Sequence, residues 1–294
     1  WGLDFATLRE DNPRLVVVSI TPFGQTGPHR NHQGCDLIAN HAGGLAFHTP
    51  AQLDDLQLPP LKPGGRQADF LTGITAALVT MGAIHRRERT GVGSHVDLSQ
   101  QEAIATGVCR DMARYSYDGT LMTRGNPGLA GLMGLLRCQN GYVHLHTRED
   151  RHWPSLVEMM GNPEWAKDGR FDDPVARDKH WEELWRNIEG WASQHTKQEI
   201  ASWAQDRHVA CGAVNNIDEV FDSPQLAARE FFVTVDHPEA GSVTLPGAPY
   251  KFDRDLWAIR RPAPRLGEHN EEILCRRLGY SHDDLTKLAA VGII

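Results

Sequence analysis

The sequence predicts an α/β fold joined to a helical region, on the strength of two observations. Over about the first 115 residues, β-branched runs alternate with longer helical patterns in the order strand, helix, strand, helix, which is typical of α/β proteins. Further along, six of the eight tryptophans fall between Trp153 and Trp203, among helical patterns such as HWEELWRNIEGWASQ.

The first strand is predicted over residues 14–20 (RLVVVSI), a β-branched run typical of a buried strand in a parallel sheet. It leads into TPFGQTGPHR, a loop rich in glycine and proline. Such a loop after a strand is either a place where α/β enzymes hold ligands or an ordinary turn. The local pattern leaves both interpretations open.

The first long helix is predicted to open at Asp69. Its apolar residues recur at helical spacing: Phe70, Ile74, Ala77, Leu78, Met81 and Ile84. The pattern stops at HRRERTG, where the arginines oppose the negative end of the helix dipole and Gly91 provides a stop.

The second strand and helix follow directly. The segment SHVDL at 94–98 predicts a short strand, and Ser99 with Glu102 predicts a capping box for a helix that runs to about Tyr115. Glycines at 125, 128, 131 and 134 cannot form a stable helix interior, since each costs about 1 kcal/mol, so 121–134 is predicted as a loop. Residues 142–147 (YVHLHT) alternate like a strand.

The tryptophan-rich stretch is predicted as a small helical domain in which the tryptophans form core. Beyond it the chain returns to mixed structure, with a strand-like GSVTL at 241–245.

Length and composition narrow the class of protein. The 294 residues suggest about two domains. A formal net charge of −8 argues against nucleic acid as the main partner, because phosphate binding favours a basic surface. No stretch reaches the ~18 uncharged apolar residues that a membrane span needs. Five widely spaced cysteines without a CxxC pair indicate free thiols in a reducing compartment.

Asp69 is the strongest candidate for chemistry on physical grounds. At a helix N-terminus, free backbone N–H groups and the helix dipole stabilise an ionised carboxylate. Such a carboxylate can act as a nucleophile or general base, and the alternative is an ordinary N-cap. The histidine pairs His29/His32 and His144/His146 lack a third ligand at a conventional spacing, so no metal site is expected.

Several motifs together resemble one family. NPRLVVVSITPFGQTGP, CDLIANHAGGLAF, DFLTGITAALVTMGAIHRRERTGVGSHVDLS, CGAVNNIDEVFDSPQLAAREFF and APRLGEHNEEIL occur in this order, and the resemblance covers essentially the whole chain. It is to the class III coenzyme A-transferases, the carnitine/bile-acid/formyl-CoA (CaiB/BaiF) transferases. The family places its nucleophilic aspartate where this chain has Asp69, so the resemblance favours the nucleophile over the N-cap.

The resemblance implies transfer of CoA between an acyl-CoA and a carboxylic acid through acyl-aspartyl anhydride and aspartyl-CoA intermediates on Asp69. No permanently bound cofactor is implied, because acyl-CoA and CoA are substrates. Thr21, Pro22, Phe23 and Gln25 match positions that line the thiol end of CoA, and Gln25 is expected to donate a hydrogen bond to the developing oxyanion. Gly128 and Gly131 match the glycine-rich loop that closes over the reacting carbonyl.

The resemblance also implies an architecture and a compartment. The fold is expected to have a Rossmann-like large domain and a smaller α+β domain, in an interlocked homodimer located in the cytoplasm. Residues 1–137 and the returning segment 236–294 are expected in the large domain, and residues 138–235 in the small one. The family opens with roughly 100 further residues that form the first Rossmann strands, so Trp1 is expected to be a cut point in a longer chain.

Two alternatives stay open. The same superfamily contains 2-methylacyl-CoA racemases, which use a His–Asp pair where this chain has Cys35 and Asp36, a second aspartate at Asp69, and a glutamate matching Glu149. Without the histidine, proton transfer at the acyl α-carbon lacks one partner, so Glu149 is expected to be a surface or supporting residue. The other alternative is a non-catalytic portion of a larger CoA-transferase-like protein.

Overall fold

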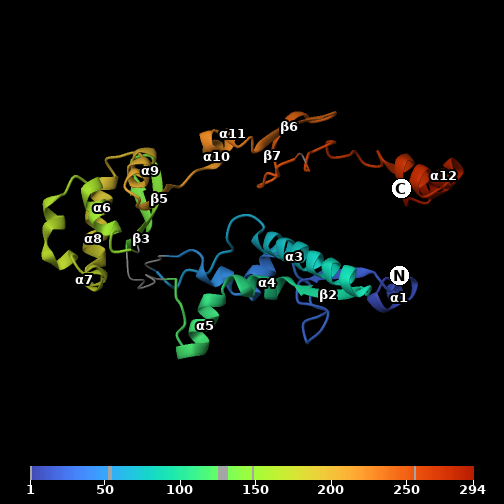
Figure 1. Ribbon diagram of the computed structural model, residues 1–294, viewed down its shortest axis with the longest axis horizontal. Coiled ribbons are helices and arrows are strands. Elements are labelled where there is room, and N and C mark those ends of the chain that lie inside the picture. The colour runs from blue at the N-terminus through green and yellow to red at the C-terminus, as the bar shows by residue number, and fades with distance from the viewer. Residues whose placement is uncertain (1, 52–54, 125–131, 148, 255) are drawn as a thin grey trace. The chain divides into compact units, whose positions relative to one another are not determined.

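The computed structural model describes residues 2–51, 55–124, 132–147, 149–254 and 256–294 (Figure 1). The chain forms two compact units, residues 1–213 and 214–294. The domain boundaries expected near 137 and 235 stay predictions.

The first part of the chain contains the predicted strand, helix, strand and helix in that order, together with a helix before the first strand and a short helix after it that the sequence did not predict. Its two strands, β1 (Val16–Thr21) and β2 (Ser94–Ser99), pair in parallel, with Val16 opposite Ser94 and Thr21 opposite Ser99. The helices are α1 (Phe5–Asp11), α2 (Asp36–Ala42), α3 (Gln67–Thr90), α4 (Gln100–Gly107) and α5 (Cys109–Asp118), and a 3-10 turn, η1 (Leu45–His48), follows α2.

The long helix α3 begins at Gln67, two residues before the predicted start. Its end is confirmed, since Gly91 has a φ of 75° and its N–H donates to the carbonyl of Arg87. Its buried face is made of small residues: Ala68, Thr72, Ala76 and Ala83.

Leu71 packs against the buried cluster of Ala39, Ala68 and Ile104, but four other large apolar side chains of α3 lie on the opposite, exposed face. Phe70, Ile74, Leu78 and Met81, here called the α3 stripe, are between 63% and 72% exposed. By length and composition alone, α3 would also be long and apolar enough to cross a bilayer, a criterion that core helices of soluble proteins meet as well.

The helix predicted from Ser99 to about Tyr115 is in fact two helices, which is a correction. Ser99 caps α4 by accepting a hydrogen bond from the N–H of Glu102 at 3.3 Å. The helix then breaks at Val108, between α4 and α5. Gly107 and the β-branched Val108 are weak helix formers, and their adjacency explains the break.

The tryptophan-rich region follows. Strands β3 (Leu132–Cys138), β4 (Gly141–Thr147) and β5 (Ala210–Ala213) form an antiparallel sheet in that order. The predicted strand at 142–147 is confirmed, whereas Gly134 lies within β3 opposite Leu145 and not in a loop. Cross-strand pairing with β4 outweighs the low strand propensity of one glycine. The region's helices are α6 (His152–Met159), α7 (Pro174–Lys179), α8 (Trp181–Ala192) and α9 (Lys197–Asp206), with 3-10 turns η2 (Glu164–Lys167) and η3 (Gly169–Phe171).

The prediction that the tryptophans form core is confirmed. Trp153 is buried in a cluster with fully enclosed side chains such as Phe171 and Leu184. The other five tryptophans of the stretch are partly buried against the same cluster.

The second unit contains α10 (Ile217–Phe221), α11 (Pro224–Ala228), the hairpin of β6 (Phe232–His237) and β7 (Gly241–Pro246), the π-helical segment η4 (Glu271–Arg277) and α12 (His282–Ala290). The strand predicted at 241–245 is confirmed as β7, which pairs with β6 in antiparallel fashion.

Candidate active site

The carboxyl ends of β1 and β2 define one edge of the parallel pair. Thr21 and Ser99 lie opposite each other at this edge. A glycine-containing loop leaves β1 here, and α4 begins here with Gln100. In open α/β sheets, ligands bind outside the carboxyl ends of the strands.

Asp69 is held at this edge by two side chains. Its Oδ1 accepts a hydrogen bond from Gln100 Nε2 at 2.9 Å, and its Oδ2 lies 2.6 Å from Arg66 Nε. The Asp69 side chain is 32% exposed. The carboxylate is therefore fixed in position while part of it stays open to solvent.

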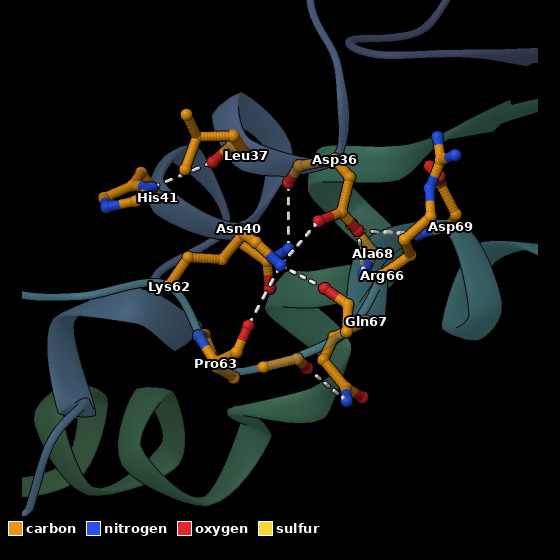
Figure 2. Close-up of polar contacts among 12 residues, drawn as sticks. Asp36, Leu37, Asn40, His41, Lys62, Pro63, Arg66, Gln67, Ala68 and Asp69 are labelled. Atoms are coloured by element: carbon orange, nitrogen blue, oxygen red, sulfur yellow. Dashed lines mark hydrogen bonds and ion pairs between the residues drawn. The ribbon is translucent and has the colours of Figure 1, made fainter.

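Asp36 is the residue that caps α3. Its Oδ1 accepts hydrogen bonds from the N–H groups of Ala68, at 2.8 Å, and Asp69, at 3.3 Å (Figure 2). Arg66, which precedes the helix, makes no side-chain cap of its own. The interpretation of Asp69 as an ordinary N-cap is therefore wrong, because a carboxylate from α2 performs that task.

The charge on Asp36 is compensated by Lys62. The Lys62 Nζ lies 3.1 Å from Asp36 Oδ2, and the Asp36 side chain is only 10% exposed. Burial raises the pKa of the Asp36 carboxyl, but the hydrogen bond from Lys62 and those from the N–H groups of Asp69 and Ala68 outweigh it. The pKa of Asp36 therefore lies below its ordinary value of 3.8.

The loop after β1 is tied to β2 and α4. The N–H of Gln25 donates to the Asp97 carboxylate at 2.9 and 3.2 Å, and the carbonyl of Pro22 accepts from the N–H of Gln101 at 3.1 Å. Gly24, between them, has a φ of 86°, a backbone conformation that residues other than glycine rarely adopt. This backbone holds the loop in place, while the Gln25 side chain stays exposed.

Two predicted CoA-contact residues have distinctive surroundings. The Thr21 hydroxyl is buried and has no hydrogen-bond partner among the described residues. The Phe23 ring lies against His29 and His32, with ring centroids 5.9 and 6.0 Å away. Buried hydroxyls are nearly always hydrogen-bonded, so the unpartnered hydroxyl of Thr21 is an uncommon feature at this edge.

The remaining predicted positions are not brought to this edge by any contact that the structure describes. Gly128 and Gly131 lie outside the described residues. Cys35, at the position of the racemase histidine, is exposed and precedes α2. The Glu149 side chain is 60% exposed and pairs with Arg151 at 2.6 Å, which lowers the pKa of Glu149. Glu149 thus has no feature of a proton donor held neutral at pH 7.

Sequence reasoning did not assign roles to Gln100, Asp97, Lys62 and the capping carboxylate of Asp36. Gln100 and Asp36 act on Asp69 across 31 and 33 residues of sequence. Only Gln100 had a local signal, since it follows the predicted N-cap Ser99 at the end of a predicted strand. In the part of the chain that the structure describes, no cluster of three or more His, Cys, Asp or Glu is arranged to hold a metal ion.

Comparisons with known proteins give a consistent result. The model of CoA-transferase family III matches residues 1–270. The chain is 30% identical to the formyl-CoA:oxalate CoA-transferase of Streptomyces coelicolor, over 100% of this chain and 74% of that protein. It is 32% identical to a succinyl-CoA:(R)-benzylsuccinate CoA-transferase subunit of Thauera aromatica, over 99% of this chain and 73% of that protein.

Solved structures agree on the fold. The crystal structure of a CaiB/BaiF family protein from Brucella suis superposes with a TM-score of 0.79 and 27% identity, over 94% of this chain and 71% of that chain. The α/β prediction is therefore confirmed, and the chain spans about three quarters of the length of these relatives.

Proposed function

The chain belongs to CoA-transferase family III, and we propose that it transfers CoA between an acyl-CoA thioester and a carboxylic acid with Asp69 as the nucleophile. The observation that carries the proposal is the carboxylate of Asp69. Gln100 and Arg66 hold its two oxygens, Asp36 caps the helix in its place, and the side chain is still partly open to solvent. A positioned carboxylate of this kind suits covalent catalysis.

The proposed reaction proceeds through two covalent states. An Asp69 oxygen attacks the thioester carbonyl and CoA leaves as a thiolate, which forms an acyl-aspartyl anhydride. The thiolate then attacks the Asp69 carbonyl carbon, which releases the first acid as a carboxylate and leaves an aspartyl-CoA thioester. The acceptor carboxylate attacks this thioester, and the expelled thiolate finally attacks the new acyl carbonyl, so that free Asp69 and the new acyl-CoA result.

Residues around Asp69 are proposed to assist individual steps of this reaction. Thr21, Pro22 and Phe23 are proposed to line the thiol end of CoA, in keeping with the buried, unpartnered hydroxyl of Thr21. The exposed Gln25 side chain is proposed to donate to the oxyanion, on a loop that Asp97 holds. Gly128 and Gly131 are proposed to cover the reacting carbonyl. CoA and acyl-CoA are substrates, and no permanently bound cofactor is part of the proposal.

The assembly and compartment are also proposals. The α3 stripe offers an apolar surface for a second copy of the chain, and we expect an interlocked homodimer. In it, residues 1–137 and 236–294 form the large Rossmann-like domain and residues 138–235 the small one. All five cysteines are free thiols, which suits a cytoplasmic enzyme of acyl-CoA metabolism.

The test is direct capture of the intermediate. The protein is incubated with succinyl-CoA or formyl-CoA, treated with hydroxylamine or borohydride, and the peptide containing Asp69 is examined by mass spectrometry. A mass shift at Asp69 that disappears in Asp69→Asn supports the proposal. Transfer that persists in Asp69→Asn would overturn it, and exchange of an α-proton for deuterium without CoA transfer would favour the racemase.

A further inference from the structure

We propose that Arg66 is the binding residue for the acceptor carboxylate and that it passes from Asp69 to the acceptor as the reaction advances. This inference rests on the proposed function. It concerns the moment at which Asp69 becomes an anhydride or a thioester and so loses its negative charge.

Arg66 is free to take a second carboxylate. Only its Nε donates to Asp69, at 2.6 Å, and its side chain is 75% exposed. Among the described residues, neither Nη1 nor Nη2 makes a hydrogen bond or ion pair. A guanidinium presents five N–H donors in a planar fork that matches a carboxylate.

The other positive groups near Asp69 are already occupied. The Lys62 ammonium donates to Asp36 and to the carbonyls of Pro63 and Gly65, which uses its three N–H groups (Figure 2). The backbone N–H groups of Ala68 and Asp69 both donate to Asp36. Within the described part of the chain, an incoming anion therefore finds Arg66 as the available cation beside the nucleophile.

The exchange conserves charge at the site. In the resting enzyme, Arg66 pairs with the Asp69 carboxylate. After acylation Asp69 is neutral, and the guanidinium would be left without its partner. An acceptor carboxylate restores one negative charge beside Arg66 and brings the attacking oxygen next to the Asp69 carbonyl carbon, which is the geometry that attack requires.

Arg66 thereby selects the second substrate by its charge. A carboxylate is the chemical class of ligand that it takes, because neutral nucleophiles such as water or alcohols make only weaker hydrogen bonds without the charge and without the two-point fit. Because the charged Asp69 carboxylate would repel an acceptor carboxylate beside the same guanidinium, the acceptor binds well only after Asp69 has been acylated, which favours the correct order of steps.

The first experiment separates the inference from the proposed function by measuring binding without turnover. Asp69→Asn keeps the shape of Asp69 but is neutral, like the acylated residue. Calorimetric titration with oxalate should show at least about tenfold tighter binding to Asp69→Asn than to the wild type. The double variant Asp69→Asn/Arg66→Met should lose that gain.

The second experiment uses turnover, with succinyl-CoA as donor and oxalate as acceptor. In Arg66→Met, the KM for oxalate should rise roughly ten- to a hundredfold. The mass adduct on Asp69 should still form with donor alone, but more slowly, because Gln100 then holds only one of the two Asp69 oxygens. Arg66→Lys should recover part of the loss. Arg86→Met, at the exposed far end of α3, is the matched control and should change neither quantity.

The outcomes are distinguishable. Equal oxalate affinity for Asp69→Asn and wild type, or an unchanged oxalate KM in Arg66→Met, would overturn the role of Arg66. Absence of any adduct on Asp69 in the wild-type protein would instead refute the nucleophile, and the titration of the Asp69→Asn variants would still decide whether Arg66 binds a carboxylate.

Discussion

The region that carries Asp69 and the tryptophan-rich region are stabilised in different ways. The tryptophan-rich region encloses large side chains, among them Phe171, Leu156 and Leu184, each almost completely buried. The Asp69 region, residues 5–118, has a core cluster of Ala39, Ala68 and Ile104, while the α3 stripe stays exposed.

The comparison shows which kind of interaction stabilises each region. Burial of large apolar groups is the main favourable term in folding, and the tryptophan-rich region supplies it within itself. The Asp69 region is held together by hydrogen bonds and an ion pair. Asp36 accepts a hydrogen bond from the N-terminus of α3 and pairs with Lys62, and Asp97 accepts one from the loop at Gln25. Large-to-small substitutions should therefore be costly in the first region, and loss of a single charge should be costly in the second.

The largest expected effect comes from the tryptophan-rich core. Phe171→Ala should lower the free energy of unfolding by about 3–5 kcal/mol, because a fully buried ring leaves a cavity. Phe70→Ala, which truncates the same side chain at a position that is 70% exposed in the single chain, should cost the dilute, unassociated chain well under about 1 kcal/mol. Urea unfolding followed by tryptophan fluorescence measures both, and equal costs would contradict the comparison.

Thiol reactivity should separate the two regions next. Burial, with a smaller contribution from Cys138, raises the pKa of Cys211 from 9.0 to about 11. At pH 8 its reactive thiolate should be about a hundredfold scarcer than in an ordinary cysteine. Cys35 and Cys109 are exposed and should react with a thiol reagent in the native protein.

The same pKa shift has a consequence for stability. Because the pKa of Cys211 is raised on folding, the contribution of the Cys211 thiol to the free energy of unfolding is complete below pH 9 and is lost as the pH rises toward 11.

The order in which the thiols react is tested by mass spectrometry of the labelled peptides. Early labelling of Cys211 under native conditions would show that the core opens more readily than its packing indicates.

The third and smaller expected effect on the free energy of unfolding comes from the hydrogen bonds and the ion pair of Asp36. Asp36→Asn removes the charge that caps α3 and leaves Lys62 without its counterion, so it should destabilise the protein by about 2 kcal/mol at pH 7. The pKa of Asp36 is lowered on folding. Its contribution is therefore present above about pH 4 and is lost as the pH falls through the lower folded-state value.

Denaturant unfolding of wild type and Asp36→Asn at several pH values tests this sign. The difference in free energy of unfolding between wild type and Asp36→Asn should stay constant from pH 5 to 8 and shrink below pH 4. Lys62→Met serves as the companion variant, because it removes the other half of the pair while leaving the cap. A difference that grows with acidification would contradict the assignment.

These contrasts also explain what the sequence could and could not predict. Local patterns identified β1, α3, β2 and the tryptophan core, because periodicity and capping residues act over a few positions. They placed Asp69 near a helix start but misassigned the cap, since Asp36 reaches the helix from 32 residues away. They likewise marked the apolar stripe of α3 without showing that its small residues face the core.

The smallest expected effect on folding comes from the α3 stripe and sharpens the comparison. Leu78 is 72% exposed, so Leu78→Ser should change the free energy of unfolding of the dilute chain by no more than about 0.5 kcal/mol. If the stripe is the surface that a second copy covers, the same substitution should abolish self-association in sedimentation experiments, because a polar hydroxyl replaces a large apolar contact. Tyr117→Ser, on α5 and 92% exposed, is the control and should leave association unchanged. A loss of several kcal/mol in the dilute Leu78→Ser chain would mean that this face is covered within one copy, and the Asp69 region would then have an apolar core of its own.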